Sequence, residues 1–173
     1  GILLDDSITS ETTSLIMDIG GGSVEFIIGN SSSILWAQSF EIGAQRLVDQ
    51  FHKEEMISAL EITKLNDFLK SQLMPLEKAL KEYLPMQFIG SSGTFDTLLS
   101  IRNASFDRSE NFIDIDEFKS IRDKLINSSL SERLKQPGMV KERAEMIVTA
   151  SLLLDFVLKI SGIPKFFISS NAL

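Results

Sequence analysis

The sequence of 173 residues contains no cysteine, which excludes a disulfide scaffold, a thiolate zinc site and a cysteine nucleophile. Its single histidine, His52, cannot build a histidine metal cage and leaves little room for a Ser-His-Asp triad. Basic residues are also few, since 17 Lys and Arg against 24 Asp and Glu give a net charge of −7. We therefore expect neither nucleic acid nor an anionic membrane as a partner, because both attract proteins through clusters of basic side chains.

Long apolar runs are missing as well. The longest, residues 146–160, is interrupted by polar residues and is too short to cross a bilayer. The first residues show neither the basic nor the apolar segment of a signal peptide. We therefore expect a cytoplasmic protein in which 146–160 belongs to a buried core helix. The chain is long enough for one or two small domains.

The first part of the chain has the pattern of β-strands. Apolar residues dominate 14–19, 24–28 and 34–40, and glycines, an asparagine and serines separate these segments. Short turns of this composition join neighbouring strands into an antiparallel meander. A short helix is expected to follow over 44–51.

From residue 54 onward, helical and strand patterns alternate. Apolar residues recur at helical spacing from 54 to Pro85. The elements predicted after this region are a strand (87–89), a helix (95–101), a polar surface loop (103–111), a helix with Asp116 as its N-cap that ends near 126, a short helical turn (129–134), a long helix (141–160) and a strand (165–169). This order predicts an α/β domain with a mixed sheet and flanking helices.

The segment from Asp18 to Glu25, with the sequence DIGGGSVE, carries the most specific chemical signal. Asp18 ends an apolar strand, where a carboxylate is costly to bury unless it meets a cation. Three consecutive glycines allow the backbone to approach a phosphate and to point its amides at it, and the Ser23 hydroxyl adds to this cradle. Asp18 and Glu25 offer hard oxygen ligands to Mg²⁺, and Glu25 can also reach an attacking water. The glycines are Gly20, Gly21 and Gly22.

This loop differs from the commoner phosphate loops. The third glycine of a G-x-G-x-x-G motif would fall at Glu25, and a strand follows where that motif requires a helix. The alternative is a plain glycine-rich hairpin in which Asp18 is only a turn residue. Plain hairpins seldom need three consecutive glycines, so the pattern favours ligand binding.

A second polar loop follows the predicted strand 87–89 and precedes a helix. Its amides and hydroxyls at a helix N-terminus can bind an anion, although the same residue types also serve as ordinary helix caps. Its presence as a second such loop in one small chain supports phosphate binding. The loop consists of Gly90, Ser91, Ser92, Gly93 and Thr94.

Basic residues offer further candidates. Arg46 follows the third strand and is expected to contact phosphate, although an ordinary surface role suits it equally well. Arg143 is expected near the start of the long helix, where a cation opposes the helix dipole unless an anion lies close. The stretch 119–143 is rich in basic residues, which indicates a solvated helical face or, alternatively, a track for a phosphorylated substrate. Its basic residues are Lys119, Arg122, Lys124, Arg133, Lys135, Lys141 and Arg143.

These motifs, taken in order, resemble the exopolyphosphatase/guanosine pentaphosphate phosphohydrolase (Ppx/GppA) family of the sugar kinase–Hsp70–actin superfamily. The resemblance begins at 18–25 and continues through 40–47 and 88–94. It extends to 143–147 and to 168–173, so that it covers nearly the whole chain. The order of the motifs is more specific than any one of them.

The resemblance implies a single ribonuclease H-like or actin-like ATPase domain over 1–173. Family members carry a preceding domain of the same fold, so this chain is expected to be the second half of a two-domain phosphatase and to be inactive alone. By resemblance, the principal catalytic glutamate lies in a Glu-Glu-Ala segment ahead of this chain, and Glu25 is an auxiliary acidic residue. Asp18 would bind Mg²⁺, and the two loops with Arg46 would hold phosphate.

The expected reaction releases terminal phosphate from polyphosphate or guanosine pentaphosphate with Mg²⁺ and water. The expected partners are that substrate, the chain's own N-terminal domain and a second copy in a homodimer. Two alternatives remain: an ATP-dependent small-molecule kinase of the same superfamily, and a non-catalytic phosphate- or nucleotide-sensing module. Retention of Asp18 and Glu25 argues against the sensor, because two carboxylates near phosphate are unfavourable without catalysis.

Overall fold

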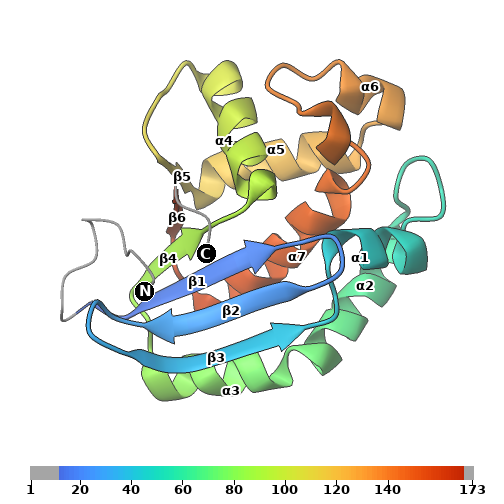
Figure 1. The fold of residues 1–173 in the computed structure, drawn as a ribbon. Coiled ribbons are helices and arrows are strands. Elements are labelled where there is room, and N and C mark those ends of the chain that lie inside the picture. The colour runs from blue at the N-terminus through green and yellow to red at the C-terminus, as the bar shows by residue number, and fades with distance from the viewer. Residues whose placement is uncertain (1–11, 170–173) are drawn as a thin grey trace.

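A computed structural model describes residues 12–169, which form one six-stranded mixed sheet with helices packed against it (Figure 1). The strands are β1 (Ser14–Ile19), β2 (Val24–Gly29), β3 (Ile34–Phe40), β4 (Gln87–Gly90), β5 (Phe112–Asp114) and β6 (Lys165–Ile168). The helices are α1 (Ala44–Phe51), α2 (Ala59–Gln72), α3 (Met74–Tyr83), α4 (Gly93–Phe106), α5 (Ile115–Ile126), α6 (Leu130–Leu134) and α7 (Ile147–Ser161), with a 3₁₀ turn at Lys141–Arg143. This architecture confirms the predicted α/β fold.

The sheet has the strand order β3-β2-β1-β4-β6-β5. Strands β1, β2 and β3 form the predicted antiparallel meander, while β4 and β6 run parallel to β1. The carboxyl ends of β1 and β4 are therefore neighbours at one edge of the sheet, and the two glycine-containing loops leave from these ends. In open α/β sheets, ligands bind outside the carboxyl ends of the strands.

Side chains alternate between the two faces of the sheet, so that one face of β1 packs in the core and the other carries Asp18. Leu15, Met17 and Ile19 of β1 are fully buried in the main core, whereas Asp18 points to the opposite face. Helix α7 lies in this core along most of its length, which confirms the helix expected within 146–160. Within residues 12–169, no helix is long and apolar enough to cross a lipid bilayer.

Strand β5 was not predicted. It contains three residues and pairs antiparallel with β6 at the edge of the sheet. The preceding loop is shorter than expected, because residues 103–106 continue α4 and the helix ends at Asp107 in a left-handed conformation. The polarity of 103–111 thus reflects exposure of a helix end as well as a loop.

The N-cap predicted at Asp116 is wrong. Helix α5 is capped by Asp114, whose side chain accepts a hydrogen bond from the Glu117 amide, and the Glu117 carboxylate accepts one from the Asp114 amide. This capping box requires an acid three residues after the cap, and only the pair 114/117 satisfies it with a glutamate.

The long helix predicted over 141–160 is also wrong at its start. Residues 141–143 form a 3₁₀ turn, and α7 begins at Ile147. The buried Arg133 explains the interruption in part, because its Nε donates to the Ala144 carbonyl at 2.8 Å. Likewise, helix α2 begins at Ala59 rather than near 54, after a capping box between Ser58 and Glu61.

Candidate active site

The first candidate loop is a tight hairpin between β1 and β2. The Gly20 amide donates to the Ser23 carbonyl at 2.9 Å and closes the turn. Asp18 and Glu25 are direct partners in the antiparallel register, so their side chains share the face opposite the core. The structure thus places these two carboxylates, both expected from the sequence to bind Mg²⁺, side by side next to the glycines.

The N-terminus of α1 holds the hairpin. Backbone amides at the start of the helix donate to the hairpin carbonyls instead of facing solvent. These hydrogen bonds join Gly43 to Gly22 (3.2 Å), Ala44 to Gly20 (2.9 Å) and Gln45 to Gly21 (3.0 Å). Because the carbonyls are used in this way, the opposite sides of the same peptides are available to a ligand. Within the described residues, the amides of Gly21, Gly22 and Ser23 donate no hydrogen bond.

Glycine at 21 and 22 is not required by the fold. Neither residue has a left-handed backbone. A Cβ on Gly21 would lie 3.7 Å from its nearest neighbour, the Gln45 Cβ, and one on Gly22 would lie 3.8 Å from Arg46 Nε. These are ordinary contact distances. The missing side chains therefore leave the hairpin backbone accessible, as a phosphate cradle requires.

Arg46 is an exposed residue on α1 that adds to this loop. Its Nε donates to the Gly22 carbonyl at 2.7 Å, which leaves the two terminal nitrogens of the guanidinium for an anion. The structure therefore places Arg46 directly beside the β1–β2 hairpin.

Glu25 is oriented by two hydroxyl groups. Ser23 Oγ donates to Glu25 Oε1 at 2.7 Å, and Ser39 Oγ donates to the same oxygen at 3.0 Å. Sequence reasoning missed Ser39. The signal available was the length of the β2–β3 turn, which sets Ser39 opposite Glu25 in the register.

The electrostatics of the two carboxylates suit a cation. Desolvation by burial, and then the nearby charge of Glu25, raise the pKa of Asp18 above its usual value. Within residues 12–169 the Asp18 carboxylate has neither a hydrogen bond nor an ion pair, and no group of three or more His, Asp or Glu residues could hold a metal. Mg²⁺ is commonly held by one or two carboxylates, with water and phosphate oxygens completing its shell, so this pair fits it.

The second candidate loop lies at the end of β4, the strand next to β1. The Ser91 amide donates to the Met17 carbonyl at 2.9 Å, which fixes this loop against β1. Gly93 and Thr94 belong to the first turn of α4 rather than to the loop itself. The N-cap Ser92 makes no capping hydrogen bond with its side chain, and its buried Oγ has no partner among the described residues. This helix N-terminus is therefore open to an acceptor.

Arg143 lies over this helix N-terminus. Its guanidinium occupies the space where a Cβ on Gly93 would stand, so glycine lets this side chain lie directly on the helix N-terminus. Arg143 is half-buried and forms neither an ion pair nor a side-chain hydrogen bond within residues 12–169. A guanidinium next to the amides of a helix N-terminus is an arrangement that can bind an anion. Gly90 has a packing role instead, because the Phe95 ring fills the space beside its α-carbon.

The turn before α7 connects the two loops. Met146 Sδ lies 3.9 Å from where a Cβ on Gly21 would stand, and Arg143, three residues earlier, covers Gly93. Thr149 Oγ1 donates to the Ala44 carbonyl at 2.9 Å and ties α7 to α1. The candidate residues of both loops thus gather at one edge of the sheet.

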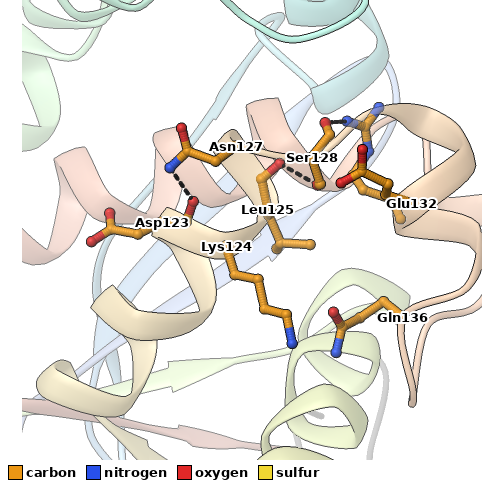
Figure 2. Close-up of a pocket in the computed structure, with 8 residues that line it drawn as sticks. Asp123, Lys124, Leu125, Asn127, Ser128, Glu132 and Gln136 are labelled. Carbon is orange, nitrogen blue, oxygen red and sulfur yellow. Dashed lines mark hydrogen bonds between the residues drawn. The ribbon is translucent and has the colours of Figure 1, made fainter.

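The basic stretch 119–143 does not form one continuous track. Arg122 pairs with Asp155 of α7, and Arg133 is buried and donates to the Ser128 and Ala144 carbonyls. A cavity of about 410 Å³ lies between α5 and α6. Figure 2 shows Lys124 and Gln136 there together with the acidic side chains of Asp123 and Glu132. Of the seven basic residues, Arg143 is the one that covers a candidate phosphate loop.

The fold defines an α/β protein with a six-stranded mixed sheet, and comparison with known proteins is more specific. The model of the Ppx/GppA phosphatase family matches residues 4–173, so the chain belongs to this family. It is 30% identical over 166 residues to the bifunctional 3-dehydroquinate synthase/phosphatase of Fusobacterium nucleatum, a match that covers 91% of this chain and 24% of the relative.

Solved structures agree with this assignment. An exopolyphosphatase from Cytophaga hutchinsonii superposes with a TM-score of 0.87 at 40% identity, over 94% of this chain and 54% of that protein. The Aquifex aeolicus PPX-GPPA enzyme gives a TM-score of 0.81 at 21% identity, over 92% of this chain and 54% of that one, and supports the fold. The chain thus spans about half the length of these two proteins.

Proposed function

We propose that this chain is the second domain of a two-domain phosphohydrolase that releases terminal phosphate from polyphosphate or guanosine pentaphosphate. The observation that carries the proposal is the pairing of Asp18 and Glu25 beside the open amides of the β1–β2 hairpin. The family assignment and the likeness to the Cytophaga hutchinsonii exopolyphosphatase support a phosphatase.

Each loop has its own part in this reaction. The hairpin amides and Arg46 bind one face of the terminal phosphoryl group, and the α4 N-terminus with Arg143 binds phosphate oxygens on the opposite side. Such preorganised donors stabilise the charge that develops in the transition state. Asp18 and Glu25 would hold Mg²⁺, and the bound ion would supply charge neutralisation at the phosphoryl oxygens.

Water is the nucleophile. Its oxygen bonds to the terminal phosphorus while the bond from phosphorus to the bridging oxygen breaks, and the shortened chain departs. Glu25 orients the water, and the water proton passes to a carboxylate outside the described residues, supplied by the preceding domain. We therefore expect residues 1–173 alone to release no phosphate.

The test uses the natural full-length chain that contains these residues. Long-chain polyphosphate and guanosine pentaphosphate are offered in parallel with Mg²⁺, and phosphate release is measured. The Asp18→Asn variant is expected to lose about 100-fold or more of the activity, since tenfold to 100-fold losses follow even from indirect disturbance of a metal site. Exposed Asp67 of α2 provides the matched control, Asp67→Asn, which should keep full activity.

Three outcomes would overturn the proposal. Release that survives Asp18→Asn would exclude the assigned site. ATP-dependent phosphorylation of a small molecule without hydrolysis would favour the kinase. Phosphate binding without turnover by the full-length chain would favour the sensing module.

A further inference from the structure

The carboxylate of Glu25 is fixed by hydroxyl groups from two different segments. Asp18, Glu25 and Ser39 are register partners across β1, β2 and β3, so their side chains form one row on the face opposite the core. We propose that Ser39 is a positioning residue that, together with Ser23, determines which oxygen of Glu25 faces the reaction. This inference rests on the proposed function.

The two hydrogen bonds act on the same oxygen. Ser23 Oγ and Ser39 Oγ lie 2.7 Å and 3.0 Å from Glu25 Oε1, and both hydroxyls donate to it. Among residues 12–169, Glu25 Oε2 accepts no hydrogen bond. The carboxylate therefore has one oxygen occupied by the protein and one reserved for a ligand, either a metal ion or a water molecule. A carboxylate held in this way cannot rotate freely to exchange the positions of Oε1 and Oε2.

The arrangement also defines the role of Ser23. A hydroxyl group has a single proton to donate, and that of Ser23 is committed to Glu25. Toward a ligand, the Ser23 oxygen can then act only as an acceptor, which suits a cation and not a phosphate oxygen. The Ser23 backbone amide remains the group that meets phosphate.

A purely structural role for Ser39 makes a different prediction. Strands β2 and β3 are already joined by a ladder that pairs Val24 with Phe40 and continues to Gly29 and Ile34. Ser39 is exposed on the edge strand, so its hydroxyl contributes little to this pairing. If Ser39 only joined the strands, its removal would leave the affinity for Mg²⁺ unchanged. If it positions Glu25, that affinity must fall while the fold persists.

The experiment compares Ser39→Ala with wild type in the natural full-length chain. We expect the Mg²⁺ dissociation constant, measured by isothermal titration calorimetry, to rise about tenfold, as when outer-shell partners of other metal sites are removed. We expect kcat for phosphate release to fall by a similar factor with KM nearly unchanged, because the hairpin amides are intact. The melting temperature should change by less than about 2 °C.

Two further variants sharpen this test. Ser39→Thr keeps the hydroxyl and should restore Mg²⁺ affinity. Ser33→Ala removes an exposed hydroxyl from the opposite end of the β2–β3 pair, where it lies 3.4 Å from Asn30 Oδ1, and should behave like wild type.

The outcomes separate this inference from the proposed function. Mg²⁺ dissociation constants that are equal in Ser39→Ala and wild type, or undetectable in both, would overturn the positioning role. If Asp18→Asn abolishes phosphate release while Ser39→Ala does not alter it, only the positioning role fails. If Asp18→Asn leaves phosphate release intact, the proposed function fails as well.

Discussion

The α-carbon of Gly43 packs directly on the backbone of Gly21: a Cβ built on Gly43 would lie 2.5 Å from the Gly21 carbonyl carbon and oxygen. Backbone cannot yield as a flexible side chain can, so Gly43→Ala must push the hairpin away from α1. We expect a loss of about 1–3 kcal/mol in the free energy of unfolding, typical of overpacking, and loss of phosphate release. Urea unfolding and the phosphate assay measure the two effects. Unchanged stability would contradict the close packing.

Gly21→Ala is the matched counterpart on the other side of this contact. Its Cβ would meet nothing closer than 3.7 Å within the described residues, so stability should change by less than about 0.5 kcal/mol. Phosphate release should nevertheless fall about 100-fold, because the methyl group would stand where phosphate approaches the amides. Full activity of this variant would place the substrate away from the hairpin.

Asp18 is expected to reduce the stability of the metal-free protein. Burial and Glu25 raise its pKa in the folded state above the unfolded value of 3.8, so the folded state binds the proton more tightly. Stability must therefore fall as the pH rises from below 3.8 through the folded-state pKa. Asp18→Asn should raise the melting temperature at neutral pH without Mg²⁺, and this gain should shrink on acidification below 3.8. A gain that is the same at every pH would refute the argument.

Arg143→Ala should weaken substrate binding with little effect on the fold. The guanidinium lacks an acidic partner within residues 12–169 and covers the α4 N-terminus, so its loss removes an anion contact worth about tenfold or more in KM. Arg143→Lys should recover only part of this, because an ammonium group lacks the planar fork. KM values identical in all three proteins would exclude Arg143 from the site.

Arg102 is expected to support the fold and not the reaction. Its side chain is fully buried, lies 3.3 Å from Glu117 and donates to the backbone carbonyls of Glu110 and Phe112. Arg102→Ala would leave the Glu110 and Phe112 carbonyls without their donor, while Glu117 keeps its ion pair with Arg108 at 2.9 Å. We expect a cost of about 2–4 kcal/mol in urea unfolding, because each unsatisfied buried acceptor costs about 1–3 kcal/mol. Lys81→Ala, which breaks an exposed pair with Glu77, should cost less than about 0.5 kcal/mol.

Much of the fold was predictable because local pattern and burial agree. The bounds of β1, β3 and α1 match those predicted, since apolar segments there are separated by turns of glycine, asparagine and serine. The predictions fail where distant contacts decide the conformation. The turn at 141–146 contains no helix-breaking residue, and part of its cause is a distant one, the hydrogen bond from Arg133 of α6 to the Ala144 carbonyl. Strand β5 exists through its pairing with β6, a partner more than 50 residues away.

The site shows the same division. The carboxylates and glycines of 18–25 are contiguous, so their chemistry is visible in the sequence. Ser39 reaches Glu25 only through strand register, and Arg143 reaches Gly93 only because the turn before α7 folds across α4. Residues of this kind are identified from strand pairing and tertiary packing, because no contiguous sequence motif contains them.

The parallel pairing of β1 with β4, with the Ser91–Met17 hydrogen bond at its end, has a consequence for substrate choice. The β1–β2 hairpin and the loop after β4 start from adjacent strands of one sheet, so the distance between them is fixed by the strand pairing. A phosphate chain of any length would then present the same terminal unit to both loops. Under the proposed function, discrimination between long and short substrates must therefore depend on a surface outside these two loops that contacts the rest of the phosphate polymer.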